Sequence, residues 1–244
     1  MEKAKALAKA IAPSGGTMSV ISIGNPKGGA GKTTLALVLA DQLSENGVNV
    51  AVIDADPNAI IAKWAAKRTD AGNDLPYTVV PRPTESEMIQ TIERLANEHD
   101  IVLIDLEGAA SRMISRALAR SHLVLVPFNQ SPVDAELAAT AVALIHEEGE
   151  ALGRRIPFRL VRSRDSAAIA TKTSKRIAMA IDEAGLPTLP VGLVERAAYR
   201  DIYEFGALLS ELDDKNTSGL LKAQENAQQL AEAVISAVKE EYAQ

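Results

Sequence analysis

The chain lacks cysteine altogether, and only 3% of its 244 residues are aromatic. Without cysteine it forms no disulfide and no thiolate-ligated metal or iron–sulfur centre. No stretch approaches the ~18 uninterrupted apolar residues of a membrane-spanning helix, and no signal peptide is visible. We therefore expect a cytoplasmic protein without stable membrane association.

The hydrophobic residues, 47% of the chain, are mostly Val, Ile, Leu and Ala. Apolar β-branched runs alternate with helical patterns, which predicts one α/β domain with a doubly wound, mostly parallel sheet flanked by helices. We place this domain at residues 18–244. The N-terminal extension, residues 1–17, contains an Ala- and Lys-rich stretch that predicts a frayed or loosely docked helix. A partner-docking or membrane-touching arm is the alternative.

The most informative stretch runs from Asn25 to Thr34. It follows an apolar run at 20–23 and opens into a helical pattern at 35–40. Strand, glycine-rich loop and helix form the context of a phosphate-binding loop, in which Lys32 reaches the β- and γ-phosphates and the Thr33 hydroxyl ligates Mg²⁺. The alternative is a glycine-rich turn that happens to end in Lys-Thr. We assign nucleotide binding to Gly28, Gly29, Ala30, Gly31, Lys32, Thr33 and Thr34.

One position departs from the general loop pattern, because Pro26 stands where glycine is usual and Lys27 follows it. The run Lys-Gly-Gly-x-Gly-Lys-Thr-Thr resembles the deviant Walker A box of the ParA/MinD family of dimeric ATPases. The resemblance implies ATP and Mg²⁺ as cofactors. It also implies that Lys27 crosses the dimer interface to the partner's nucleotide; otherwise Lys27 is a solvated loop cation.

Two acids, Asp54 and Asp56, follow the next predicted strand, residues 48–53. Strand ends of this kind are where α/β sheets bind ligands. The segment resembles the family's Walker A′ motif, Asp-x-Asp-Pro-Gln, with Asn58 in the last place. The resemblance implies that Asp56 positions the attacking water and that Asp54 supports the Mg²⁺ shell. The structural alternative is a strand-end turn in which an aspartate caps the following helix.

A third acid, Asp105, ends the apolar run 101–105 in the Walker B form, where it can hold Mg²⁺ through a water. The continuation Leu106-Glu107-Gly108 departs from the family pattern. We expect Glu107 to be an exposed loop charge, with a metal-shell role as the alternative. Further along, residues 127–134 resemble a family segment on the dimer face, although Asp134 also suits a helix N-terminus.

The net charge is −6, yet residues 154–200 hold ten Arg or Lys against four Asp or Glu. Such asymmetry can mark a polyanion-binding face on an acidic protein. A solvated surface paired with acids is the alternative. Residues 196–201 also resemble the family's Arg-x-Ala-Phe-Arg-Asp segment, which lies near the nucleotide. The candidate DNA-binding residues are Lys172, Lys175, Arg176, Arg196 and Arg200.

The resemblance implies an ATPase in which Lys27, Lys32 and Asp56 are catalytic and Thr33, Asp54 and Asp105 serve the metal. It further implies a homodimer in the ATP state, non-specific binding of double-stranded DNA with nucleoid association, and a ParB-like or cargo adaptor protein that stimulates hydrolysis. A MinD-like membrane-cycling ATPase and a P-loop ligase or kinase for a small molecule are the alternatives. The acidic final helix predicted at 216–243 argues against membrane targeting.

Overall fold

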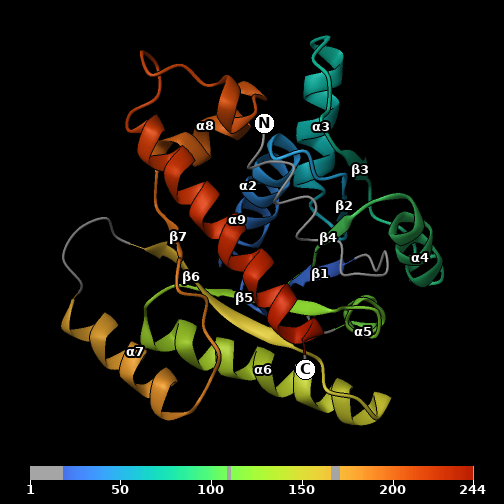
Figure 1. Cartoon of the computed structure of the whole chain (residues 1–244), viewed down its shortest axis with the longest axis vertical. Coiled ribbons are helices and arrows are strands. Elements are labelled where there is room, and N and C mark those ends of the chain that lie inside the picture. Colours follow the sequence, from blue (N-terminus) through green and yellow to red (C-terminus); the bar gives the residue numbers. More distant parts are fainter. Residues whose placement is uncertain (1–18, 109–110, 166–170, 244) are drawn as a thin grey trace.

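The structure is a computed structural model that describes residues 19–108, 111–165 and 171–243. The N-terminal extension and its predicted helix lie outside these residues. A seven-stranded sheet forms the centre, with strand order β3-β2-β4-β1-β5-β6-β7 and every neighbouring pair parallel (Figure 1). This confirms the predicted doubly wound α/β class. The strands are β1 Ser19–Ile23, β2 Val50–Asp54, β3 Thr78–Val80, β4 Ile101–Asp105, β5 Leu123–Phe128, β6 Phe158–Asp165 and β7 Leu193–Val194.

Helices cover both faces of the sheet and create two hydrophobic layers. One layer joins the sheet to α2, α3, α8 and α9, and the other joins it to α4, α5, α6 and α7. In Figure 1, α9 crosses in front of the sheet, while α6 and α7 lie below β5 and β6. The bounds are α2 Lys32–Glu45, α3 Ile60–Asp70, α4 Met88–Glu98, α5 Arg112–Leu118, α6 Pro132–Leu152, α7 Lys172–Glu183, α8 Ala197–Phe205, the 3₁₀ turn η1 Leu209–Glu211 and α9 Leu220–Tyr242.

The sequence explains these elements locally. Strands β1, β2, β4 and β5 are buried along their whole length, which is why their sequences read as continuous apolar runs rather than alternating ones. Helix α6 begins where the Ser131 side chain accepts a hydrogen bond from the Asp134 N–H, with Pro132 in its first turn. It ends at Gly153, whose φ of 64° suits a residue without a side chain.

The segment 186–190, Leu-Pro-Thr-Leu-Pro, reads in the sequence as a short terminal strand, and this prediction is wrong. The last strand is instead β7, and only Thr188 of the predicted segment forms a bridge, to Leu160. The cause is that Pro187 and Pro190 have no N–H to donate to a ladder. The final helix begins at Leu220 rather than 216. The sequence also predicts a helix over residues 167–184, and within the described residues it runs from Lys172 to Glu183.

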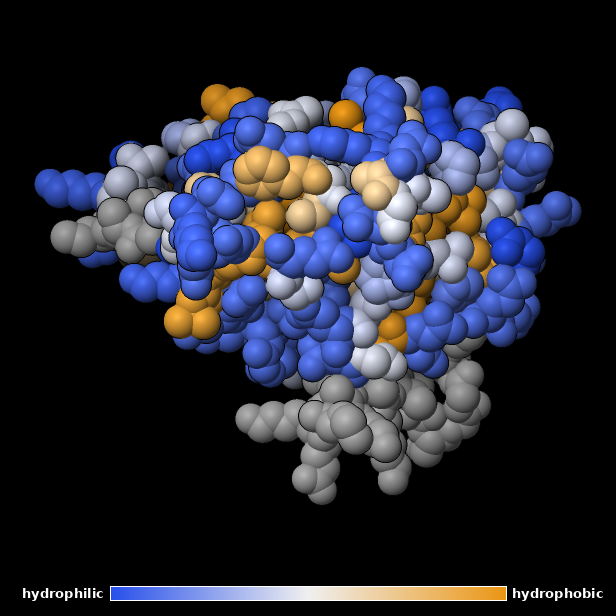
Figure 2. Space-filling view, turned by 90° about the horizontal axis from the view of Figure 1, so that it is seen from above, coloured by the Kyte–Doolittle hydropathy of each residue, from blue (hydrophilic) through white to orange (hydrophobic). Residues whose placement is uncertain are grey.

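Within the described part of the chain, no helix is long and apolar enough to cross a membrane. Seen from above, the surface is mainly hydrophilic, with hydrophobic residues in separate patches (Figure 2). The strand that carries the loop of residues 25–34 is β1, which lies between β4 and β5 at the centre of the sheet. The loop therefore opens at the C-terminal edge of the strands, where α/β sheets bind ligands.

Candidate nucleotide-binding site

The glycine-rich loop joins β1 directly to α2, which begins at Lys32. The predicted sequence of strand, loop and helix is thus present. Gly31 has a φ of 95°, and a Cβ atom at this position would stand 2.2 Å from Ser163 Oγ. Only glycine fits there, for reasons of both conformation and space. Gly28 and Gly29 are exposed, while Ala30 is buried.

The Lys32 side chain is buried and curls over the loop. Its Nζ donates hydrogen bonds to the carbonyl oxygens of Asn25 at 3.1 Å and Lys27 at 3.0 Å. Burial lowers the pKa of Lys32, and the negative charges of Asp105 and Asp56 oppose that shift. The ammonium group therefore lies between the loop and the acids at the strand ends, as a phosphate-binding lysine requires.

Asp54 and Asp105 stand side by side at the ends of β2 and β4, because they are paired in register. Both residues are fully buried. Asp54 Oδ2 accepts a hydrogen bond from the Ala62 N–H at 2.8 Å, whereas Asp54 Oδ1 and both carboxylate oxygens of Asp105 have no hydrogen-bond partner among the described residues.

Burial raises the pKa of Asp105 to about 7, and the charge of Asp54 raises it further, while the Thr33 hydroxyl and Lys32 act in the opposite direction. Two adjacent buried carboxylates with unsatisfied oxygens, next to a threonine hydroxyl, form the hard oxygen donor set that Mg²⁺ prefers. The residues present therefore fit the predicted metal, which Thr33, Asp54 and Asp105 would hold.

Asp56 is half-buried in the turn between β2 and α3. Its Oδ1 accepts hydrogen bonds from the N–H and the Nδ2 of Asn58, both at 2.8 Å. Asp54, not Asp56, accepts a hydrogen bond from an N–H group in the first turn of α3. The alternative in which an aspartate caps this helix therefore applies to Asp54. Asp56 stays a prediction as the residue that orients water.

Lys27, the predicted inter-subunit lysine, is held within its own subunit. Its Nζ lies 2.8 Å from Asp134 Oδ1. The lysine side chain is 35% exposed and the aspartate side chain 5%. Asp134 also contacts the Ser131 hydroxyl at the start of α6. The ion pair thus joins the glycine-rich loop to the segment that resembles the family's dimer face.

Glu107 is not the exposed loop charge that we expected. Its side chain is 12% exposed and forms an ion pair with Arg82 at 3.2 Å. Gly108 lies directly against the loop, because a Cβ there would stand 2.9 Å from the carbonyl oxygen of Pro26. The unusual Leu106-Glu107-Gly108 segment therefore packs on the glycine-rich loop, with glycine required at the contact.

A cavity of about 130 Å³ opens beside the loop, between β6 and α8. The loop supplies Gly31 and Thr34 to its wall. Ser163 Oγ and Arg196 Nε are buried in this region without a hydrogen-bond partner among the described residues. Three of its residues, Ser163, Arg164 and Tyr203, are not among the site residues predicted from the sequence, which leaves open whether residues 162–164 contact the base. The available signal was that β6, like β1, β2 and β4, ends at this edge of the sheet.

The five predicted DNA-binding residues fall into two groups. Lys172, Lys175 and Arg176 are exposed in the first turns of α7. Arg196 and Arg200 line the cavity beside the loop, and Figure 1 shows α7 and α8 in separate parts of the molecule. Arg196 precedes α8 in an extended conformation, so the two arginines are not successive positions of one helix face.

A phosphate-binding loop at the central strand, with a buried lysine and strand-end carboxylates, defines a P-loop nucleotide-binding domain. The family model described as "VirC1 protein" matches residues 18–240. The chain belongs to this family, and through it to the ParA/MinD group of P-loop ATPases.

Individual relatives agree with this assignment. The chain is 36% identical to "Protein ParA" of Rhizobium radiobacter over 91% of its length and 99% of the relative's. It is 27% identical to "Protein virC1" of the same organism, over 78% of this chain and 83% of the relative. The solved structure "Cyanthece apo McdA" has the same fold, with a TM-score of 0.72 at 19% identity, covering 89% of this chain and 99% of that one.

Proposed function

We propose that the chain is an ATP-driven switch: it hydrolyses ATP with Mg²⁺, dimerises in the ATP state, binds DNA without sequence preference and positions a cargo. The observation that carries the proposal is that Lys32 and Thr33 meet the buried carboxylates of Asp54 and Asp105, whose oxygens are only partly satisfied. A triphosphate with its divalent cation has the charges that complement both.

In this proposal the chain contributes binding and orientation, on which phosphoryl transfer to water depends. The backbone N–H groups of residues 28–34 bind phosphate oxygens, and Lys32 Nζ exchanges its carbonyl partners for the β- and γ-phosphates. Mg²⁺, held by Thr33, Asp105 and Asp54, would neutralise charge on these phosphates. Asp56 accepts a hydrogen bond from the attacking water and so orients it.

Dimerisation in the ATP state is supported by the position of Lys27. Its partner Asp134 is almost fully buried, but the lysine itself is about one-third exposed at 35%. A phosphate of a second subunit's nucleotide can compete for the ammonium group, since an ion pair at such an exposed position is weak. The same exchange would link nucleotide binding to the start of α6.

DNA binding is supported by Lys172, Lys175 and Arg176, which are exposed together and form no ion pair with any described residue. Cations of this kind neutralise phosphates and give salt-sensitive, sequence-independent binding. Arg196 and Arg200 form a second candidate group beside the nucleotide. Arg200 already pairs with Glu195 at 3.3 Å, although both side chains are mostly exposed.

The ATPase part is tested with two variants. Lys32→Ala loses nucleotide binding by more than about 100-fold, because the phosphates lose their buried cation. Asp56→Ala keeps ATP affinity, while turnover falls by about 100-fold or more, the usual contribution of a group that positions or activates water. Calorimetry measures binding and phosphate release measures turnover. Asp70→Ala, an exposed acid at the end of α3, is the control; unchanged turnover in Asp56→Ala removes that residue from the mechanism.

The switch part is tested by fluorescence anisotropy of random-sequence duplex DNA with Mg-ATP or Mg-ADP at two salt concentrations. We expect binding that requires ATP and weakens at high salt. A triple alanine variant of Lys172, Lys175 and Arg176 should lose it. The charge-matched control replaces three other exposed lysines, Lys215, Lys222 and Lys239. Absence of binding in both nucleotide states would contradict the DNA role, and equal binding in both would contradict the switch.

A further inference from the structure

Strand β6 contains an irregularity at Arg164. Ser163 pairs with Leu193 of β7, and Asp165 pairs with the next residue, Val194, so that Arg164 is the extra residue of a bulge. Bulges redirect a side chain and are frequent beside active sites. Arg164 has a φ of +50°, a left-handed conformation that glycine adopts at little cost and arginine does not.

The bulge directs the Arg164 side chain to the glycine-rich loop. Its Nη2 lies 4.0 Å from the place that a Cβ on Gly29 would occupy. Arg164 also shares the wall of the neighbouring cavity with Gly31 and Thr34. The preceding residue, Ser163, is wedged against Gly31, which fixes the end of β6 to the loop.

The described residues give the Arg164 guanidinium nothing to bind. Arg164 is exposed, and it has no hydrogen bond or ion pair with any described residue. Arginine in a conformation that favours glycine persists where the surrounding structure or a ligand maintains it. No described residue pairs with the guanidinium, and its position against the loop leaves it accessible to a ligand bound there.

We infer that Arg164 binds the phosphate chain of the nucleotide in its own subunit, from the side of the loop formed by Gly29 and Gly31. This inference rests on the proposed nucleotide site and adds a residue to it. The backbone N–H groups of a P-loop cradle the α- and β-phosphates, whereas the loop lysine reaches the β- and γ-phosphates. Arg164 lies beside those backbone groups, so its contact is made with ADP as well as with ATP. It is a positioning residue for the phosphates.

The test compares Arg164→Gly, Arg164→Lys and wild-type protein by calorimetric titration with Mg-ADP and with the non-hydrolysable analogue Mg-AMPPNP. In Arg164→Gly both affinities fall by about tenfold, the usual value of one charge-assisted hydrogen bond. Arg164→Lys restores part of that loss, because it keeps the charge without the planar fork. Arg94→Ala, which removes an exposed arginine from α4, leaves both affinities unchanged.

The Arg164→Gly variant also distinguishes a role of Arg164 in ligand binding from a role in stabilising the fold. Because the backbone at this position suits glycine, nucleotide-free Arg164→Gly should melt at the wild-type temperature or above it. A lower melting temperature would mean that the arginine supports the fold, and would overturn the inference. Unchanged ADP affinity in Arg164→Gly would also overturn the inference, even if the variant lost dimerisation in the presence of AMPPNP. If wild-type protein binds neither nucleotide, the proposed function itself is contradicted. This outcome differs from one in which wild-type protein binds both nucleotides and only the inference about Arg164 is contradicted.

Discussion

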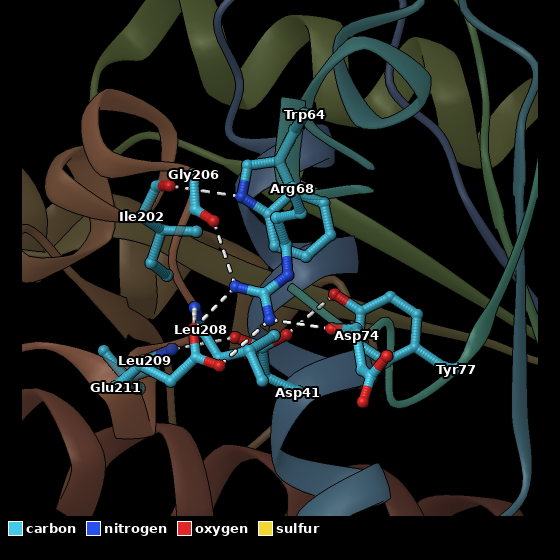
Figure 3. A network of polar contacts seen from close by, with 10 residues as sticks. All are labelled: Asp41, Trp64, Arg68, Asp74, Tyr77, Ile202, Gly206, Leu208, Leu209 and Glu211. Atoms are coloured by element: carbon cyan, nitrogen blue, oxygen red, sulfur yellow. Dashed lines mark hydrogen bonds and ion pairs between the residues drawn. The ribbon is translucent and has the colours of Figure 1, made fainter. Parts of the chain in front are cut away.

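Arg68 and Asp105 are both charged residues with buried side chains, but their surroundings are completed in different ways. Arg68, at the end of α3, is 1% exposed. Its Nη1 donates to the carbonyl of Gly206 at 3.0 Å and to Glu211 at 2.6 Å, while its Nη2 donates to the carbonyl of Asp74 at 2.8 Å and to Glu211 at 2.9 Å (Figure 3). The guanidinium also lies 5.5 Å from the centre of the Trp64 ring.

Asp105 is 0% exposed, and neither of its carboxylate oxygens has a hydrogen-bond partner among the described residues. Its nearest charged neighbour across the strand is another acid, Asp54. A buried charge costs free energy unless it is paired. The Nε of Arg68 has no hydrogen-bond partner among the described residues, but the charge of Arg68 is paired with Glu211. In this sense the Arg68 cluster is complete in the isolated chain and the Asp105 cluster is not. From this difference we infer that the Arg68 cluster stabilises the fold and that the Asp105 cluster binds a ligand.

Helix α3 connects the two clusters. Asp54 accepts a hydrogen bond from the Ala62 N–H in its first turn. Further along the helix, Trp64 Nε1 donates to the Ile202 carbonyl at 3.1 Å and Lys67 Nζ donates to the Glu204 carbonyl at 2.5 Å. These contacts attach the last turns of α3 to α8, which carries Arg200 and Tyr203 of the cavity beside the loop. The Arg68 cluster therefore fixes the position of α3 and α8, which lie next to the Asp54 and Asp105 carboxylates and the cavity beside the loop.

The largest effect is expected from Arg68→Ala. It leaves two carbonyl groups and Glu211 without their donor and opens a cavity under Trp64, so the free energy of unfolding falls by about 3 kcal/mol or more. Urea denaturation followed by Trp64 fluorescence or circular dichroism measures it. Arg94→Ala, which breaks an exposed pair with Glu98, should cost less than about 0.5 kcal/mol. Similar losses in both variants would mean that the buried network is not the framework.

Asp105→Asn should have a smaller effect of the opposite sign. It removes one of two adjacent buried carboxylates, so the nucleotide-free, Mg²⁺-free protein gains about 1 kcal/mol of stability. The same change weakens nucleotide binding in the presence of Mg²⁺, because a metal-holding oxygen has become an amide. Denaturation without metal and nucleotide titration at several Mg²⁺ concentrations give the two readouts. A loss of stability without metal would place Asp105 in the framework instead.

The incomplete cluster was the part that the sequence could predict. A glycine-rich loop and acids at strand ends are local patterns, and the parallel strands bring their C-terminal ends to one edge. The pairing of Asp54 with Asp105 depends on strand order, which the sequence did not supply. The Glu107–Arg82 pair was missed for a similar reason, since Arg82 follows a different strand.

The complete cluster could not be predicted, because its partners are distant in sequence. Arg68 and Glu211 are 143 residues apart. Arg68 stands beside Lys67 near a helix end, a position typical of exposed cations. The bulge at Arg164 was equally hidden, since it arises from the register between β6 and β7 rather than from a sequence motif.

The remaining expected effect is pH-dependent and concerns Asp41, which lies beside Arg68 in the complete cluster. Its carboxyl group accepts hydrogen bonds from the Tyr77 hydroxyl at 2.7 Å and the Leu209 N–H at 3.0 Å. Burial raises the pKa of Asp41 from 3.8 to about 7, against the effect of these hydrogen bonds. The folded protein therefore holds a proton that the unfolded chain releases. The resulting stabilisation is full below about pH 4 and is lost as the pH rises toward 7.

Asp41→Asn removes this titration and retains the contacts, since the amide oxygen can accept from Leu209 and the amide nitrogen can donate to the Tyr77 hydroxyl. The difference in unfolding free energy between variant and wild type should then shift in favour of the variant by at least about 1 kcal/mol between pH 5 and pH 7. Urea denaturation at several pH values measures it, with Asp70→Asn, an exposed acid, as the control. Parallel curves for variant and wild type would mean that Asp41 is charged in the folded protein. The complete cluster would then contain a buried acid stabilised by Arg68 and its hydrogen bonds, rather than a neutral one.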